Sequence, residues 1–185
     1  MAEINPEQAF YTQIYNDQVN FPNYGHTSHG DPYFITILDM HPTSWLDVGC
    51  GHNHMIKECR ENKYIADVLG VDFACPSADQ NCDMLDLPFA DNRWDVVSAF
   101  DVMEHLLPEQ VDTGLSEMAR VGKRFIFTIS YYRALTEING KNAHPTVWSA
   151  DKWIAKIEQY GTIDDMSQTD KGLFIGEWKD YDAKE

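Results

Sequence analysis

The chain has 185 residues, enough for one domain with a substantial core, and 43% of them are hydrophobic. Its net charge of −16 argues against nucleic acid or an anionic membrane as partner, because both are bound mainly through Lys and Arg. No apolar run is long enough to span a membrane, and the start MAEINPEQAF lacks a signal-peptide pattern. We expect a single domain over residues 1–185 in the cytoplasm, with four reduced cysteines and no metal.

Residues 1–43 are expected to form an N-terminal helical and lid segment. The stretch NPEQAFYTQIYNDQ predicts a helix with Asn5 as cap and Pro6 in the first turn. The next stretch, VNFPNYGHTSHGDP, is rich in turn formers and aromatic residues and indicates an ordered loop. A second helix is predicted for DPYFITILDM, with Asp31 as its cap and Pro32 at the first position.

Residues 44–185 are expected to form an α/β core, because strand and helix patterns alternate there. Apolar runs typical of buried parallel strands cover residues 44–49, 67–72, 94–100 and 124–130. Helices are predicted at 54–63, at 108–121 and after Ser149, and TIDDM and GLFIGEWK are predicted as two closing strands. Only ten residues, FACPSADQNC, separate Asp72 from Asp83, which is too short for a crossover helix and predicts a trimmed sheet edge.

Glycines and acids follow the predicted strands, at the ends where such sheets bind ligands. Gly49 and Gly51 leave bare main chain on which a ligand can lie. Asp72, 21 residues after Gly51, is suited to the two hydroxyls of a ribose, and Asp83 to an exocyclic amine. Each feature alone also fits a tight turn, a helix cap or a solvated acid. Their combination predicts a nucleoside site.

The glycine loop also indicates which nucleoside is bound. It runs GCGHNH, so the third glycine of the dinucleotide pattern is absent, and the turn contains no Arg or Lys to bind phosphate. A cationic ligand without phosphate fits this acidic site better, and S-adenosylmethionine is such a ligand. A nicotinamide-dependent reductase is the less favoured alternative.

The segments LDVGCG, VLGVD, CDMLDLPFADNRWDVV and SAFDVMEHL resemble the successive motifs of the class I S-adenosylmethionine-dependent methyltransferases, over roughly residues 44–130. The resemblance implies a Rossmann-like, mostly parallel seven-stranded sheet with an antiparallel last strand. It implies S-adenosylmethionine as cofactor and S-adenosylhomocysteine as product. The cofactor-binding residues that it implies are Asp47, Gly49, Cys50 and Gly51 for the methionine half, Asp72 for the ribose, Phe73, Asp83 and Met84 for the adenine, and Phe100 for the methyl end.

Methyl transfer from a sulfonium is an in-line displacement with a neutral leaving group, so a general base is needed only when the acceptor must lose a proton. The candidate bases are His105, His26, His29 and His144. The resemblance favours His105, with packing or capping as its alternative role. Tyr24 and His26 are expected in a lid over the cofactor, and His144 at the acceptor rim. The expected acceptor is a small molecule or a protein side chain, and not nucleic acid. The alternative function is a regulatory or scaffold member that binds the cofactor without turnover.

Overall fold

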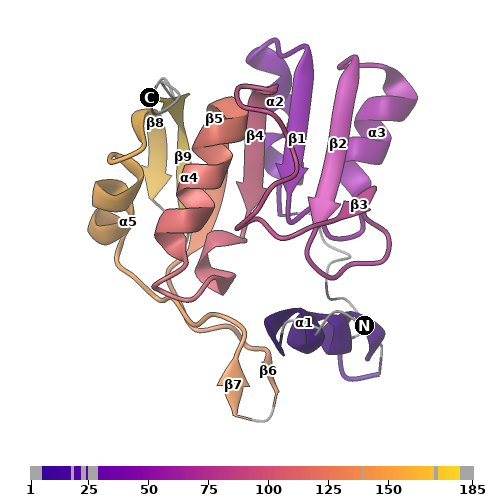
Figure 1. The fold of residues 1–185 in the computed structure, drawn as a ribbon, viewed down its shortest axis with the longest axis vertical. Helices are drawn as coiled ribbons and strands as arrows, with labels where there is room; N and C mark the ends of the chain where they lie inside the picture. Colours follow the sequence, from indigo (N-terminus) through magenta and orange to yellow (C-terminus); the bar gives the residue numbers. More distant parts are fainter. Residues whose placement is uncertain are drawn as a thin grey trace.

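The computed structural model describes residues 6–17, 19–21, 24, 29–138, 140–168 and 171–179. Its centre is a seven-stranded sheet in the order β3-β2-β1-β4-β5-β9-β8 (Figure 1). The strands are β1 (Ser44–Val48), β2 (Asp67–Asp72), β3 (Gln80–Asn81), β4 (Trp94–Phe100), β5 (Gly122–Ser130), β8 (Gly161–Gln168) and β9 (Lys171–Trp178). The first five are parallel, whereas β9 runs antiparallel to both β5 and β8. The predicted α/β sheet with an antiparallel last strand is confirmed.

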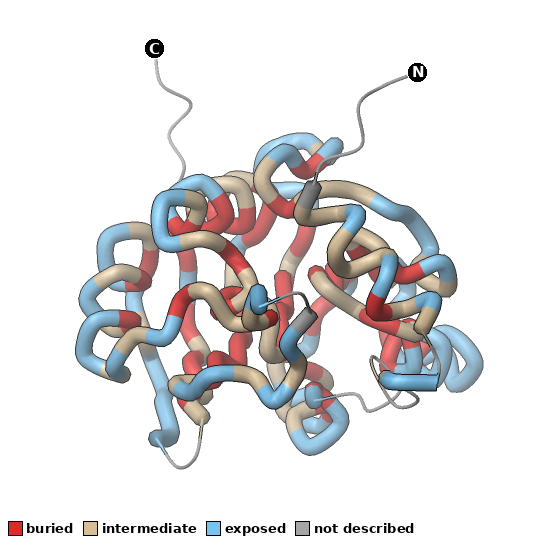
Figure 2. Tube along the Cα trace, turned by 90° about the horizontal axis from the view of Figure 1, so that it is seen from below, coloured by how far each residue is buried: buried red, intermediate tan, exposed pale blue. Residues whose placement is uncertain are grey.

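Helices cover both faces of the sheet, because its central strands are apolar on both sides. Every residue of β1 is buried, and β4 is almost entirely buried. On one face, Trp45 and Val96 pack with α2 (Phe34–Asp39) and α3 (His54–Asn62). On the other, Leu46 and Phe125 pack with α4 (Val111–Val121) and α5 (Ala150–Ile157). Figure 2 shows the buried residues gathered along the strands, with exposed residues on the outer turns.

Three helix caps were predicted, at Asn5, Asp31 and Ser149, and the structure confirms the one at Ser149. The Ser149 side chain accepts a hydrogen bond from the Lys152 amide and caps α5. The cap at Asp31 is wrong: Asp31 lies inside a 3₁₀ helix, η1 (Asp31–Tyr33), which begins after Gly30 and has no side-chain cap. The Tyr33 amide bonds to the Gly30 carbonyl, so the turn starts one residue earlier than predicted. The N-terminal helix α1 covers Pro6–Asn16, and its predicted cap, Asn5, lies outside the described residues.

The edge of the sheet beyond β2 is trimmed, as the short 73–82 segment predicted. Strand β3 has two residues, and it pairs with Val71 and Asp72 of β2. A loop replaces the crossover helix and is held by side chains. The Asn81 amide donates to the carbonyls of Asp72 and Cys75, at 3.1 and 2.8 Å. Asp79 accepts from the Gly70 amide at 3.1 Å.

Two segments from opposite ends of the sequence form a roof beyond the carboxyl ends of β1, β2 and β4 (Figure 1). One is α1, and the other is the hairpin β6 (Glu137–Ile138) and β7 (Lys141–Asn142). Gln8 of α1 donates to the Phe73 carbonyl at 3.0 Å, and Tyr11 donates to the Ala143 carbonyl at 3.2 Å. These bonds connect α1 to the segment after β2 and to the segment after the hairpin.

Candidate functional site

A cavity of about 610 Å³ lies between the carboxyl edge of the sheet and the roof. This volume is in the usual range for small-molecule sites. The predicted site residues that line it are Tyr24, Asp47, Gly49, Cys50, Gly51, Asp72, Phe73, Asp83, Met84, Phe100, His105 and His144. His26 was also predicted, and it lies outside the described residues. The structure therefore brings together residues from the ends of β1, β2, β3 and β4 with Tyr24 and His144.

The turn after β1 needs residues that tolerate the left-handed region of backbone space. Gly49 has φ +73° and Gly51 has φ +52°, which favour glycine. A β-carbon on Gly49 would also lie 2.4 Å from the Val102 side chain. Asn53 lies one residue before the position of the third glycine in a dinucleotide-binding pattern. It has φ +65°, a conformation that Asn tolerates better than most residues. The bare main chain of this turn faces the cavity.

The carboxylate of Asp72 lies directly beside that turn. Its Oδ2 accepts from the Gly51 amide at 3.1 Å and from the Tyr15 hydroxyl of α1 at 3.3 Å. Its Oδ1 accepts from the amides of Ala74 and Cys75, at 2.8 and 2.7 Å. Backbone amides thus fix the orientation of the side chain, and Oδ2 is the oxygen on the side of the roof. The contact from Tyr15 could not be read from the sequence.

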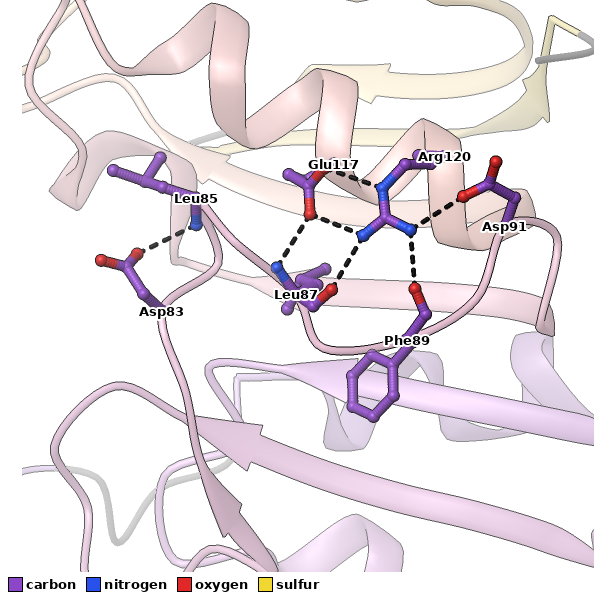
Figure 3. A network of polar contacts seen from close by, with 7 residues as sticks. All are labelled: Asp83, Leu85, Leu87, Phe89, Asp91, Glu117 and Arg120. Atoms are coloured by element: carbon purple, nitrogen blue, oxygen red, sulfur yellow. Dashed lines mark hydrogen bonds and ion pairs between the residues drawn. The ribbon is translucent and has the colours of Figure 1, made fainter. Parts of the chain in front are cut away.

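Asp83 follows β3, in a loop that α4 holds in place. Its Oδ1 accepts from the Leu85 amide at 2.9 Å (Figure 3). Further along the same loop, the guanidinium of Arg120 donates to the carbonyls of Leu87 and Phe89, at 2.8 and 2.6 Å. The same guanidinium is ion-paired with Asp91 and Glu117, and Glu117 accepts from the Leu87 amide. Arg120 therefore fixes the path of the loop that carries Asp83 and Met84 along the cavity wall.

Asp47 is an acid with little access to water, since only 5% of its surface is exposed. Ser98 donates to its Oδ1 at 2.6 Å, and Trp45 in turn donates to Ser98 at 2.8 Å. Burial raises the pKa of Asp47 to about 7, against the lowering effect of the Ser98 bond, and the charge of Asp72 adds to the rise. A cation bound nearby would favour the ionised form of Asp47.

His105 follows β4, in the 3₁₀ helix η2 (Met103–His105), and lines the cavity with His144. Its Nδ1 lies 2.8 Å from the Ala143 carbonyl, which can only accept, so Nδ1 carries the proton and Nε2 has a lone pair. Burial and then the neighbouring His144 lower the pKa of His105 to about 4. The two rings meet edge to face with centroids 4.7 Å apart, and His144 Nδ1 donates to the Tyr132 carbonyl at 2.7 Å. His105 is therefore a neutral imidazole at pH 7.

Glu104, next to His105, is fully buried. Its Oε1 accepts from the Ser130 amide at 2.8 Å, and among the described residues its Oε2 has no hydrogen-bond partner. Burial raises the pKa of Glu104 to about 8, and the charge of Asp101 adds to the rise. The side chain is thus mainly a neutral carboxylic acid at pH 7, tied to the end of β5.

A charged cluster around Asp101 also lines the cavity, and the sequence analysis did not assign it. Asp101 has φ +55° directly after β4, and its Oδ1 accepts from the Thr128 hydroxyl at 2.8 Å. Its Oδ2 forms an ion pair with Lys171 of β9 and lies 3.3 Å from His29 Nδ1. The available signal was its position, since Asp101 follows a strand end just as Asp72 does. No pattern linked it to Lys171, 70 residues further along the chain.

The fold and the cavity correspond to the Rossmann-like class I methyltransferase architecture. Residues 46–125 match the family model described as "Methyltransferase domain". This match, together with the fold, confirms the predicted resemblance to the class I S-adenosylmethionine-dependent methyltransferases and the prediction of S-adenosylmethionine as the cofactor. No curated protein matches the sequence.

Solved structures with a similar fold support this classification. One is a 1,6-didemethyltoxoflavin-N1-methyltransferase of Burkholderia thailandensis, with 1,6-didemethyltoxoflavin and S-adenosylhomocysteine bound (16% identity, TM-score 0.65, 97% of this chain and 93% of that one). Another is a Haloferax volcanii putative methyltransferase in complex with the activator Trm112 (14%, 0.65, 92% and 100%). A third is a protein of Pyrococcus horikoshii OT3 (16%, 0.64, 89% and 98%). At these identities the similarity concerns the fold.

Neither a membrane-spanning helix nor a metal-binding cluster occurs among the described residues. In the described part of the chain, no helix combines the length and apolar character needed to cross a membrane. Within the same residues, no group of three or more His, Cys, Asp or Glu side chains is arranged to hold a metal ion.

Proposed function

We propose that this protein transfers the methyl group of S-adenosylmethionine to an N–H or O–H centre of a small molecule, with His105 as the general base. One observation carries the proposal: His105, with an unprotonated Nε2, lines the same cavity as the glycine turn and the acids of successive strand ends. The similarity to a methyltransferase with a bound small molecule supports this class of acceptor. The proposal treats the described chain as one methyltransferase domain.

The chemistry of the lining residues fits the cofactor. Asp47, Asp72 and Asp83 lie at the ends of, or just after, β1, β2 and β3, and no Lys or Arg follows these strands in the described lining. Such a surface suits a sulfonium, an ammonium group and ribose hydroxyls, and disfavours phosphate. A ribose hydroxyl would donate to Asp72 Oδ2, so the Tyr15 hydroxyl must share or leave that oxygen.

Each residue has a definite role in this proposal. The Gly49–Gly51 turn and Asp47 hold the methionine half, Asp72 the ribose, and Asp83 the adenine amine. Phe73 packs on the adenine ring, and the Met84 backbone amide bonds to a ring nitrogen. Phe100 lies at the methyl end. Tyr24 and the roof close the cavity, and His144 lines the acceptor side.

S-adenosylmethionine, held by the Gly49–Gly51 turn and by Asp72 and Asp83, would supply an electrophilic methyl group for in-line displacement, with a neutral thioether as the leaving group. The protein aligns the acceptor with the methyl carbon, which is its main contribution to the rate. The acceptor's proton passes to Nε2 of His105, whose Nδ1–H is held by the Ala143 carbonyl. The pKa of about 4 keeps Nε2 free over the whole neutral range.

The test is transfer of a labelled methyl group from S-adenosylmethionine to a pool of small metabolites, comparing the wild type with His105→Asn and His105→Gln. Asn retains an N–H near the Nδ1 position and lacks Nε2, so it isolates the base. Removal of a general base lowers the rate by roughly 10²–10⁴-fold. We expect such a loss with unchanged affinity for S-adenosylhomocysteine.

The result also separates the proposal from its alternative. If the wild type binds S-adenosylhomocysteine and labels nothing, the protein is a non-catalytic member of the fold. If His105→Asn retains the wild-type rate, the cavity is catalytic and His105 has a packing role.

A further inference from the structure

The cavity divides into two sides of different electrostatic character, and the division follows the order of the strands. The carboxyl ends of β1 and β2 and the residues after β3 contribute the carboxylates Asp47, Asp72 and Asp83. The Lys, Arg and His residues of the described lining come from other segments: His29 before η1, His105 after β4, Arg133 after β5, His144 after β7, and Lys171 at the start of β9. The first side is assigned above to the cofactor, so the second is left for the acceptor.

The acids on the acceptor side are already engaged. Asp101 is ion-paired with Lys171 and accepts from the Thr128 hydroxyl. Glu7 of α1 accepts from the Gln110 side chain at 3.1 Å. These bonds hold both carboxylates in internal contacts, and the Lys171 ammonium is positioned at the cavity wall by Asp101.

Arg133 is the cation best able to bind a new partner. It lies between β5 and the hairpin, and its side chain is 70% exposed. Its ion pair with Glu137 spans 3.7 Å between two exposed groups, and such pairs contribute little to stability. The guanidinium can therefore exchange this contact for a bidentate bond to an oxyanion at small cost.

The histidines on this side of the cavity lie near both members of the Lys171–Asp101 ion pair. Burial lowers the pKa of His144, the bond to the Tyr132 carbonyl and the charge of Asp101 raise it, and the charge of Lys171 makes a smaller contribution to the lowering. His29 Nδ1 lies 3.4 Å from the Lys171 ammonium. Arg133 and Lys171 would repel a positively charged group of a ligand here, whereas they would attract a negatively charged group.

We propose that the methyl acceptor carries an oxyanion, a carboxylate or a phosphate, which Arg133 binds from the cavity lining. The N–H or O–H nucleophile of the same molecule then faces His105. This inference rests on the proposed function, because it takes the acidic side of the cavity as the cofactor's.

The test uses three phenols that differ in one group: 4-hydroxyphenylacetate, 4-hydroxyphenylethanol and 4-hydroxyphenylethylamine. Each is titrated by ligand-observed NMR into the full chain saturated with S-adenosylhomocysteine, and phenyl phosphate distinguishes phosphate from carboxylate recognition. A charge-assisted bond predicts that the carboxylate probe binds roughly tenfold more tightly than the amine, with the alcohol between them. Arg133→Gln should reduce the carboxylate preference several-fold, whereas Arg93→Gln, an exposed arginine paired with Asp67 of β2, should not.

The outcomes are distinguishable from failure of the proposed function. Saturation with S-adenosylhomocysteine is measured first, and failure at that step refutes the cofactor site itself. If the cofactor binds and the amine is the preferred phenol, the oxyanion site is wrong. The same conclusion follows if the three phenols bind equally or if none of them binds. A preference for the carboxylate that persists unchanged in Arg133→Gln also contradicts it. Arg133 is exposed, so loss of folding is not expected to obscure its result.

Discussion

Replacement of Asp72 by asparagine tests the ribose contact with a minimal change of shape. The carboxylate accepts four hydrogen bonds in the structure, three of them from the backbone amides of Gly51, Ala74 and Cys75. An asparagine can keep Oδ1 toward Ala74 and Cys75, but then places an NH₂ where Oδ2 accepts from Gly51. The variant therefore loses the acceptor for a ribose hydroxyl and opposes two donors at one position.

The expected magnitude follows from that single oxygen. A hydrogen bond to a charged group contributes about 1.5–3 kcal/mol, which is roughly a 10- to 150-fold change in the dissociation constant. Calorimetric titration with S-adenosylhomocysteine measures it, and the melting temperature reports any loss of folding. Asp67→Asn is the matched control, because Asp67 lies at the other end of β2 and pairs with the exposed Arg93. A dissociation constant within twofold of wild type in a folded Asp72→Asn would refute the ribose assignment.

Three further predictions concern other parts of the cavity wall. Arg120→Lys should lower the free energy of unfolding by roughly 1–3 kcal/mol in urea titrations and should weaken the binding of S-adenosylhomocysteine several-fold. The reason is that lysine cannot reproduce the planar guanidinium that holds the Asp83 loop. Wild-type affinity in this variant would show that Arg120 is not needed to position the loop. Glu104 has a folded pKa of about 8 against 4.5 unfolded, so the folded state binds more protons between these values and stability falls as pH rises through that window. Glu104→Gln should remove this loss, and its melting temperature relative to wild type should rise from pH 6 to pH 9; a constant difference would contradict a buried neutral acid. Asp47, with a pKa of about 7, should ionise on cofactor binding, so affinity for S-adenosylhomocysteine should fall from pH 8 to pH 6 in wild type and change less in Asp47→Asn.

The strands and the acids at their ends could be predicted because the information is local. A buried parallel strand has an apolar run of its own, as in β1 and β4, and the residue after it must lie at the carboxyl edge. That rule alone placed Asp72 and Asp83 in one cavity with Gly49 and Gly51. The short segment after Asp72 likewise predicted the trimmed edge.

The remaining features depend on contacts between residues far apart in the chain, which no local pattern encodes. The Tyr15 hydroxyl reaches Asp72 across 57 residues, and Lys171 reaches Asp101 across 70. The proton position on His105 depends on the Ala143 carbonyl, in a hairpin that was not predicted. The raised pKa of Glu104 depends on complete burial, which the charged residue itself gives no reason to expect.

The central claim is that the acidic, cation-free side of the cavity selects a positively charged nucleoside without phosphate. The most direct test is calorimetric titration of the wild-type protein with S-adenosylmethionine and, separately, with NAD, under identical salt and pH. The account predicts micromolar binding of S-adenosylmethionine and at least hundredfold weaker binding of NAD, because the described residues at the ends of β1, β2 and β3 offer three carboxylates and no Lys or Arg to the pyrophosphate. Binding of NAD with equal or greater affinity would contradict it.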